Sequence, residues 1–185
     1  MRGARTAAGV LALAAGLTGP AARAGELGSP VGLFVEGGLA DDARSLVVGA
    51  AWTWAAPSRW DGLHWSGYLE TSIGEWNCRK SPDGPFRACA TQLGLTPVIR
   101  FQPLEWTHWY LELGIGLDAI LPLYQSDRRQ FFTEFNFGDH FGIGRRFGDG
   151  GRDEIELRGE HYSNGGYRNP NPGENWLQLR YMHWF

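Results

Sequence analysis

The sequence predicts an all-β protein, an eight-stranded antiparallel transmembrane β-barrel. Three observations lead to this fold class. Apolar and polar residues alternate with a period of two in one segment after another. Trp, Tyr and Phe are abundant, and Gly is very abundant, with 27 glycines in 185 residues. The N-terminus also has the features of an export signal.

The first 24 residues predict a secretory signal peptide. Arg2 and Arg5 precede a short apolar run at 7–17, and Ala22-Arg23-Ala24 is similar to an A-x-A cleavage site. The alternative is a membrane anchor, but the run is shorter than the roughly 20 residues that cross a bilayer. We therefore expect residues 25–185 to form the barrel as one domain.

Removal of this leader makes the protein more acidic. Without its three arginines, the 17 basic residues fall to 14 against 20 acidic residues. No basic patch remains, which argues against nucleic acid as a partner. The two cysteines, Cys78 and Cys89, flank a turn-rich loop. In an oxidising compartment they could form a disulfide, and two free thiols are the alternative.

Period-two alternation identifies eight strands in chain order, at residues 31–38, 45–54, 63–73, 92–101, 109–118, 135–144, 155–160 and 177–185. In the first four, the apolar set is Val31, Leu33 and Val35; Leu46, Val48, Ala50, Trp52 and Trp54; Leu63, Trp65, Leu69 and Ile73; and Leu93, Leu95, Pro97, Ile99 and Phe101. In the last four, it is Trp109, Leu111, Leu113, Ile115 and Leu117; Phe135, Phe137, Phe141 and Ile143; Ile155 and Leu157; and Leu177, Leu179, Tyr181 and Phe185.

The opposite face of these strands mixes small residues with charged ones such as Glu36, Glu70 and Arg100. A water-soluble barrel of the lipocalin kind would bury the apolar face and expose the charged one. Alternation alone does not separate the two arrangements, but charged residues and glycines fill a dry ligand cavity poorly. Aromatic residues near strand ends and the C-terminal Phe185 also favour a membrane barrel.

Connection lengths predict the orientation. The connections around 57–61, 102–105 and 148–152 are short, and those around 77–88, 121–132 and 165–173 are longer. Short turns face the periplasm and long loops face the outside. The first outer connection, near 39–44, is short and is a mild exception.

Candidate catalytic residues lie at the external end of the seventh strand. His161 and Ser163 are two residues apart, so they share a face, and they have the parity of the lipid-facing Ile155 and Leu157. A base and a nucleophile on one face predict a serine esterase, with the N–H groups of Asn164-Gly165-Gly166 as an oxyanion hole. The alternative is that these are residues of the membrane-interface belt.

Asp139 lies on the same apolar face of the sixth strand, between Phe137 and Phe141. If the following turn centres near Gly150, Asp139 falls opposite His161. Either the register is misassigned or Asp139 belongs to the site.

The sequence at this point resembles the lipid A 3-O-deacylase (PagL-type) family of outer-membrane enzymes. The motifs are His161-Tyr162-Ser163-Asn164 with Gly166, then Pro170-Asn171-x-Gly173, and upstream Phe137-Gly138-Asp139-His140. The detailed match covers the chain from Phe137 to the C-terminus. Earlier strands agree in architecture only.

The resemblance implies a Ser-His-Glu triad on the outer surface of the barrel and hydrolysis of the ester-linked acyl chain at the 3-position of lipid A. It implies His161 as base, Ser163 as nucleophile, Asn164 and Gly166 near the oxyanion, and Asp139 and Asn171 as supporting residues. The family glutamate falls twelve residues after the serine, and that position is Asn175 here. We expect Glu174 to supply the carboxylate through loop geometry, with Asp139 as the alternative.

Other partners are not indicated. No Cys/His cluster has metal-ligand spacing and no phosphate-binding glycine loop is present, so we expect neither a metal nor an organic cofactor. The implied partners are lipid A or lipopolysaccharide as substrate and the cell outer membrane as location. A homodimer is compatible with the sequence, but nothing argues for one. The alternative function is a non-catalytic small barrel with an adhesive or structural role.

Overall fold

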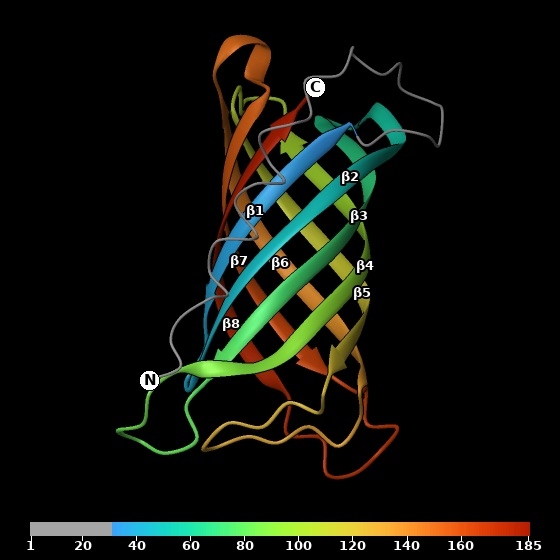
Figure 1. Ribbon diagram of the computed structural model, residues 1–185. Helices are drawn as coiled ribbons and strands as arrows, with labels where there is room; N and C mark the ends of the chain where they lie inside the picture. The colour runs from blue at the N-terminus through green and yellow to red at the C-terminus, as the bar shows by residue number, and fades with distance from the viewer. Residues whose placement is uncertain (1–30) are drawn as a thin grey trace.

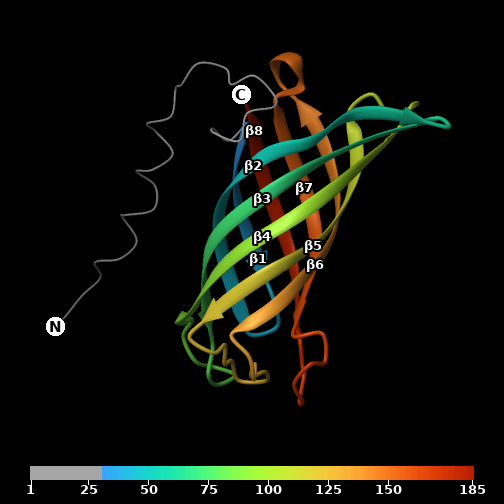
Figure 2. The ribbon, with the colours of Figure 1, turned by 90° about the vertical axis from the view of Figure 1, so that its right-hand side faces the viewer.

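Eight antiparallel strands, each hydrogen-bonded to the next along the chain, close into a barrel when β8 pairs with β1 (Figures 1 and 2). The computed structural model describes residues 31–185. The strands are β1 (Gly32–Leu39), β2 (Ala43–Trp60), β3 (Leu63–Cys78), β4 (Arg87–Pro103), β5 (Trp109–Leu121), β6 (Phe135–Phe147), β7 (Asp153–Ser163) and β8 (Glu174–Trp184). A 3₁₀ turn, η1 (Asp149–Gly151), joins β6 to β7. The predicted signal peptide at 1–24 lies outside the described residues.

The predicted fold class is confirmed, and each predicted strand overlaps an observed one. The clearest boundary error is the turn expected around 57–61. β2 instead continues through Pro57 with two register shifts, and the turn is Asp61-Gly62 alone, with φ values of 39° and 82°. Two consecutive positive φ angles fit a two-residue hairpin turn that matches the twist of the strands.

The long loops gather at one end of the barrel. The loops at 79–86, 122–134 and 164–173 share the lower end in Figure 1 with the short β1–β2 connection. We call this the loop end. The disulfide between Cys78 and Cys89 closes the first of these loops.

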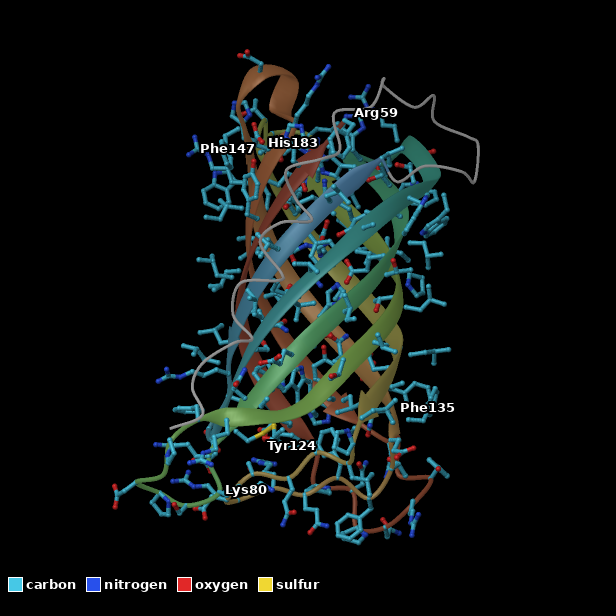
Figure 3. All side chains as sticks on the ribbon, viewed as in Figure 1. Arg59, Lys80, Tyr124, Phe135, Phe147 and His183 are labelled. Atoms are coloured by element: carbon cyan, nitrogen blue, oxygen red, sulfur yellow. A yellow bond between two sulfur atoms is a disulfide. The ribbon has the colours of Figure 1, made fainter. Side chains whose placement is uncertain are left out.

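Apolar side chains cover the outside of the barrel. The side chain of Ile115 on β5 is 67% exposed, whereas that of Glu112 on the same strand is fully buried. Phe135 and Phe147 project away from the barrel wall (Figure 3). This distribution reverses that of a water-soluble barrel and is the one that a surrounding lipid phase stabilises. Among residues 31–185 there is no helix long and apolar enough to span a membrane.

Ion pairs fill the interior. Arg100 binds Glu154 through two hydrogen bonds of 2.6 and 2.7 Å. Arg158 donates to Glu156 at 3.0 Å and to Glu70 at 3.1 Å. The Arg100–Glu154 and Arg158–Glu70 contacts cross the lumen between strands that are not neighbours in the sheet. The interior is therefore a packed polar core, and the small cavity beside Glu70 and Asp118 has a volume of about 10 Å³.

At the loop end the interior becomes aromatic. Trp76 contacts Tyr124, Tyr162 and Trp176 with ring centroids 5.2, 5.0 and 4.6 Å apart. Tyr124 belongs to the β5–β6 loop (residues 122–134), and its side chain is fully buried. This loop is therefore folded over the end of the barrel and held there by apolar packing.

The interior pairs predict a strong dependence of stability on Arg158. Replacing it with Leu leaves Glu70 and Glu156 buried without this partner, and we expect the free energy of unfolding to fall by about 3–5 kcal/mol. Urea titration of the purified barrel in detergent measures this change. Arg128→Leu removes an arginine that is 64% exposed, and water screens its pairs with Asp41 and Asp42, so we expect a loss of about 1 kcal/mol or less. Equal losses in the two variants would contradict the interpretation.

Candidate active site

His161 and Ser163 lie at the loop end of β7 on the outer face of the barrel. His161 is exposed and Ser163 is half-buried, while Tyr162 between them is buried inside. The predicted shared face follows from strand alternation. The two residues are therefore reachable from the phase that surrounds the barrel rather than from its lumen.

Three polar residues form a row across β6, β7 and β8. His161 pairs with Asp139 on one side and with Asn175 on the other. The pairing of Asp139 with His161 agrees with the register expected from the sequence. Asp139 is exposed on the outer face, so of the two explanations considered for its parity, a misassigned register is excluded.

Asn175 holds the imidazole. The Nδ1 atom of His161 lies 2.7 Å from Oδ1 of Asn175. Because an amide oxygen only accepts hydrogen bonds, this contact fixes the proton on Nδ1. The other ring nitrogen, Nε2, then carries the free lone pair, which is the tautomer that a general base requires.

Gly173 packs against the other edge of the same ring. A Cβ atom built on Gly173 would lie 2.6 Å from Cε1 and 3.1 Å from Nε2 of His161. Its φ angle is 60°, a conformation that favours glycine. Any side chain at this position would therefore both strain the backbone and push the imidazole away.

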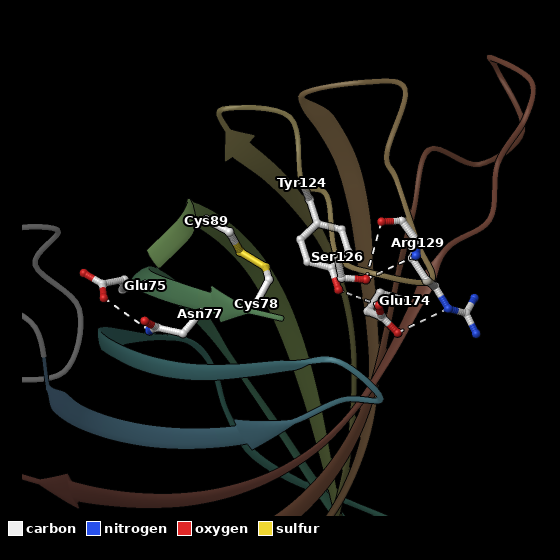
Figure 4. The surroundings of a disulfide bond; sticks show 8 residues. All are labelled: Glu75, Asn77, Cys78, Cys89, Tyr124, Ser126, Arg129 and Glu174. Atoms are coloured by element: carbon white, nitrogen blue, oxygen red, sulfur yellow. Dashed lines mark hydrogen bonds and ion pairs between the residues drawn. A yellow bond between two sulfur atoms is a disulfide. The ribbon is translucent and has the colours of Figure 1, made fainter. Parts of the chain in front are cut away.

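The prediction that Glu174 orients His161 is wrong. Glu174 pairs with Tyr162 across β7 and β8, and it is 1% exposed, with its side chain inside the barrel. Its carboxylate accepts a hydrogen bond of 2.7 Å from the hydroxyl of Tyr124 and lies 3.6 Å from Nε of Arg129 (Figure 4). The physical reason is that β8 already begins at Glu174, so a one-residue offset turns the side chain to the opposite face.

Two asparagines build the loop that follows Ser163. The N–H of Asn164 donates to Oδ1 of Asn171 at 3.0 Å, and Oδ1 of Asn164 accepts from the N–H of Gly166 at 2.9 Å. The side-chain amide of Asn164 donates to the carbonyl of Arg168 at 2.9 Å. The N–H groups of Asn164 and Gly166 are thus used within the loop.

The N–H of Gly165 is the loop donor that points at Ser163, 3.4 Å from its Oγ. Between residues 31 and 185, no hydrogen bond joins Ser163 to the imidazole of His161. The nucleophile candidate therefore sits beside a backbone donor, on the same face as the base candidate.

Tyr124 and Arg129 support this region and were not identified from the sequence. They lie in the β5–β6 loop, which has no alternating pattern, and nothing in the sequence places that loop beside β8. Across the described range no group of three or more His, Cys, Asp or Glu side chains is arranged to hold a metal ion.

Comparison with known proteins gives consistent matches. Residues 46–184 match the model of the family described as lipid A 3-O-deacylase (PagL). The lipid A deacylase PagL of Bordetella bronchiseptica is 32% identical over 136 residues, which cover 72% of this chain and 70% of that protein. A crystal structure of the outer membrane enzyme PagL superposes with a TM-score of 0.69 at 22% identity, covering 83% of this chain and 99% of the other.

Proposed function

This chain belongs to the lipid A 3-O-deacylase (PagL) family and is an enzyme of that class; from this premise we propose that it removes the 3-O-acyl chain of lipid A with Ser163 as nucleophile and His161 as general base. The observation that carries the proposal is the hydrogen bond between His161 Nδ1 and Asn175 Oδ1, which leaves Nε2 as the base on the face that also carries Ser163.

The proposed reaction has two steps. Ser163 Oγ attacks the ester carbonyl carbon while its proton passes to Nε2 of His161. The imidazolium then protonates the departing 3-oxygen of the sugar, which leaves an acyl-serine ester. A water molecule, deprotonated by His161, then attacks the carbonyl carbon of this ester. The imidazolium returns that proton to the departing Oγ of Ser163, which releases the fatty acid and restores the enzyme. Hydrogen bonds between nucleophile and base are often long before the substrate binds.

We propose the N–H of Gly165 as the donor to the oxyanion. It lies 3.4 Å from Ser163 Oγ and is not used elsewhere in the loop, unlike the N–H groups of Asn164 and Gly166. Asn164, Gly166 and Asn171 would then act by holding the loop in shape. Asp139, next to His161 in the row, is proposed as a supporting residue on the substrate side.

The location follows from the same face of the barrel. The row of Asp139, His161 and Asn175 lies at the loop end and borders the apolar band of the outer face. Polar groups in that position are expected at the interface between lipid tails and headgroups. There an ester of lipid A reaches Ser163 directly from the outer leaflet of the outer membrane, with no passage through the lumen. The signal peptide expected at 1–24 would serve export to that membrane.

The acyl chain has a channel along β7 in this proposal. Gly159 faces outward on β7, two residues before His161. A Cβ atom built on Gly159 would meet no other side chain or backbone atom within 4 Å beyond its chain neighbours. Its register partners, Phe141 and Leu177, are exposed apolar residues that rise on either side. A chain lying over Gly159 would bury apolar surface while its ester remains at Ser163.

Ser163→Ala tests the nucleophile. We expect activity to fall about a thousandfold or more, because Ser163 carries the one hydroxyl on the outer face of β7, two residues from His161. Mass spectrometry of lipid A from cells that express each variant shows whether the 3-O-acyl chain is lost, with Ser81→Ala in the first long loop as a control. Complete deacylation of lipid A by the Ser163→Ala variant would contradict the proposed mechanism and the assignment of the protein as a serine esterase.

Asn175→Asp tests the neutral orienting residue through pH dependence. A carboxylate beside Nδ1 favours the imidazolium form of His161, so a higher pH is needed to free the base. We expect the acid limb of the kcat/KM profile to move upward by about one pH unit. Asn169→Asp adds the same charge to the neighbouring loop and should leave the limb in place. An unchanged profile for Asn175→Asp would show that Asn175 does not act on the base.

Gly159→Leu tests the proposed acyl channel. The new side chain occupies the open space over position 159, so we expect activity on long-chain substrates to fall about tenfold, with shorter chains affected less. Gly37→Leu is the matched control, since Gly37 is also an outward-facing strand glycine with open space around it, on β1. Equal activities of the two variants would place the acyl chain elsewhere.

A further inference from the structure

The start of β8 alternates across the barrel wall in a way that links the proposed catalytic histidine to the interior. Gly173 packs against His161 from outside, and Asn175 bonds its Nδ1 from outside. Glu174 lies between them in sequence and points inside. Any force that fixes Glu174 from within therefore also fixes the two residues that hold the imidazole.

The β5–β6 loop supplies that force. The hydroxyl of Tyr124 donates a hydrogen bond of 2.7 Å to Oε2 of Glu174, and burial raises the pKa of Tyr124, so its phenol remains a donor. Arg129 pairs with Oε1 of Glu174 at 3.6 Å. Figure 4 shows both side chains converging on this carboxylate from the loop.

Arg129 also binds the backbone that precedes Glu174. Its Nη1 donates to the carbonyl of Pro172 at 2.8 Å and to that of Gly173 at 3.1 Å. The β7–β8 ladder begins only at Glu174, so sheet hydrogen bonds do not hold these two residues. Without sheet hydrogen bonds, the backbone at Pro172 and Gly173 could adopt several conformations. The hydrogen bonds from the Arg129 guanidinium hold it in one of them.

The loop that carries Arg129 is itself well anchored. Tyr124 and Phe131 are buried in the aromatic cluster at the loop end. Between them, the N–H of Ser126 donates to the carbonyl of Arg129 at 2.8 Å, and the N–H of Arg129 donates to Oγ of Ser126 at 3.1 Å. Arg129 is thus presented from a fixed hairpin, with its side chain only 29% exposed.

We propose that Arg129 is a positioning residue for the deacylation: by binding Pro172, Gly173 and Glu174 it fixes the backbone that orients His161. This inference rests on the proposed role of His161 as the base. Glu174 acquires a different role from the one its sequence position indicated, because it anchors the base from the opposite side of the wall. The adjacent Arg128, by contrast, pairs with Asp41 and Asp42.

The test compares Arg129→Ala, Arg129→Lys and Arg128→Ala as full-length proteins folded in detergent, with lipid A as substrate. We expect kcat of Arg129→Ala to fall about 10- to 100-fold at a KM within about twofold of wild type, because a displaced base slows chemistry without removing a substrate contact. Lys should recover part of the loss, since an ammonium can still reach a carbonyl. Arg128→Ala should stay within about twofold of wild type.

A second comparison separates positioning from general stability. On an Asn175→Ala background the imidazole has already lost its partner, so Arg129→Ala should reduce kcat less than it does in wild type. Equal reductions on both backgrounds would overturn the proposal. So would a wild-type kcat for Arg129→Ala, or a raised KM with unchanged kcat, which would make Arg129 a substrate contact.

Heat-dependent gel mobility reports whether each variant is folded. If Arg129→Ala fails to fold, Glu174→Gln takes its place, because Gln keeps the volume and can still accept the bond from Tyr124 but loses the charge that pairs with Arg129. We expect its kcat to fall about 3- to 10-fold, and a wild-type kcat would overturn the proposal. Failure of the mechanism itself is distinguished by Ser163→Ala, which would then retain activity.

Discussion

The barrel wall is one residue thick, and every strand residue points either into the lumen or out of it. Because this alternation has a period of two, residues that are neighbours in sequence experience opposite environments. Tyr162 packs in the aromatic interior while His161 and Ser163 face outward. The same rule turns Glu174 inward and Asn175 outward, and so decides which side chain can reach the imidazole.

The interior makes an outward-facing site workable. A catalytic group on the outer face of a strand cannot be supported by a surrounding protein core on that side. Its rigidity must come from the ladder on either flank and from whatever lies behind the wall. Here Arg100 and Arg158 join distant strands through buried carboxylates, and the loop end is filled by aromatic rings and the β5–β6 loop. The candidate site is therefore a single row of polar residues, Asp139, His161 and Asn175, on the outer face of strands whose inner face is tightly packed.

An amide in place of a carboxylate changes the chemistry of the row but not its geometry. Asn175 accepts from Nδ1 as a carboxylate would, so the tautomer is kept. It adds no negative charge beside the imidazolium that the proposed mechanism requires at His161. Asp139, on the other side of His161, is the nearest carboxylate in the row by register. The chain thus separates the orienting group from the charged group, which in a Ser-His-acid triad are the same residue.

Alternation, the glycine and aromatic content and the spacing of His161 and Ser163 were sufficient to predict the barrel, the outward face of these two residues and the pairing of Asp139 with His161. These are local or period-two properties, and an antiparallel meander with short turns carries them into three dimensions with little ambiguity. The strand boundary at Glu174 and the contacts of Tyr124 and Arg129 were not predictable in this way. They depend on where the β7–β8 ladder begins and on how a loop without a pattern folds over the barrel end, and only packing between segments distant in sequence decides both.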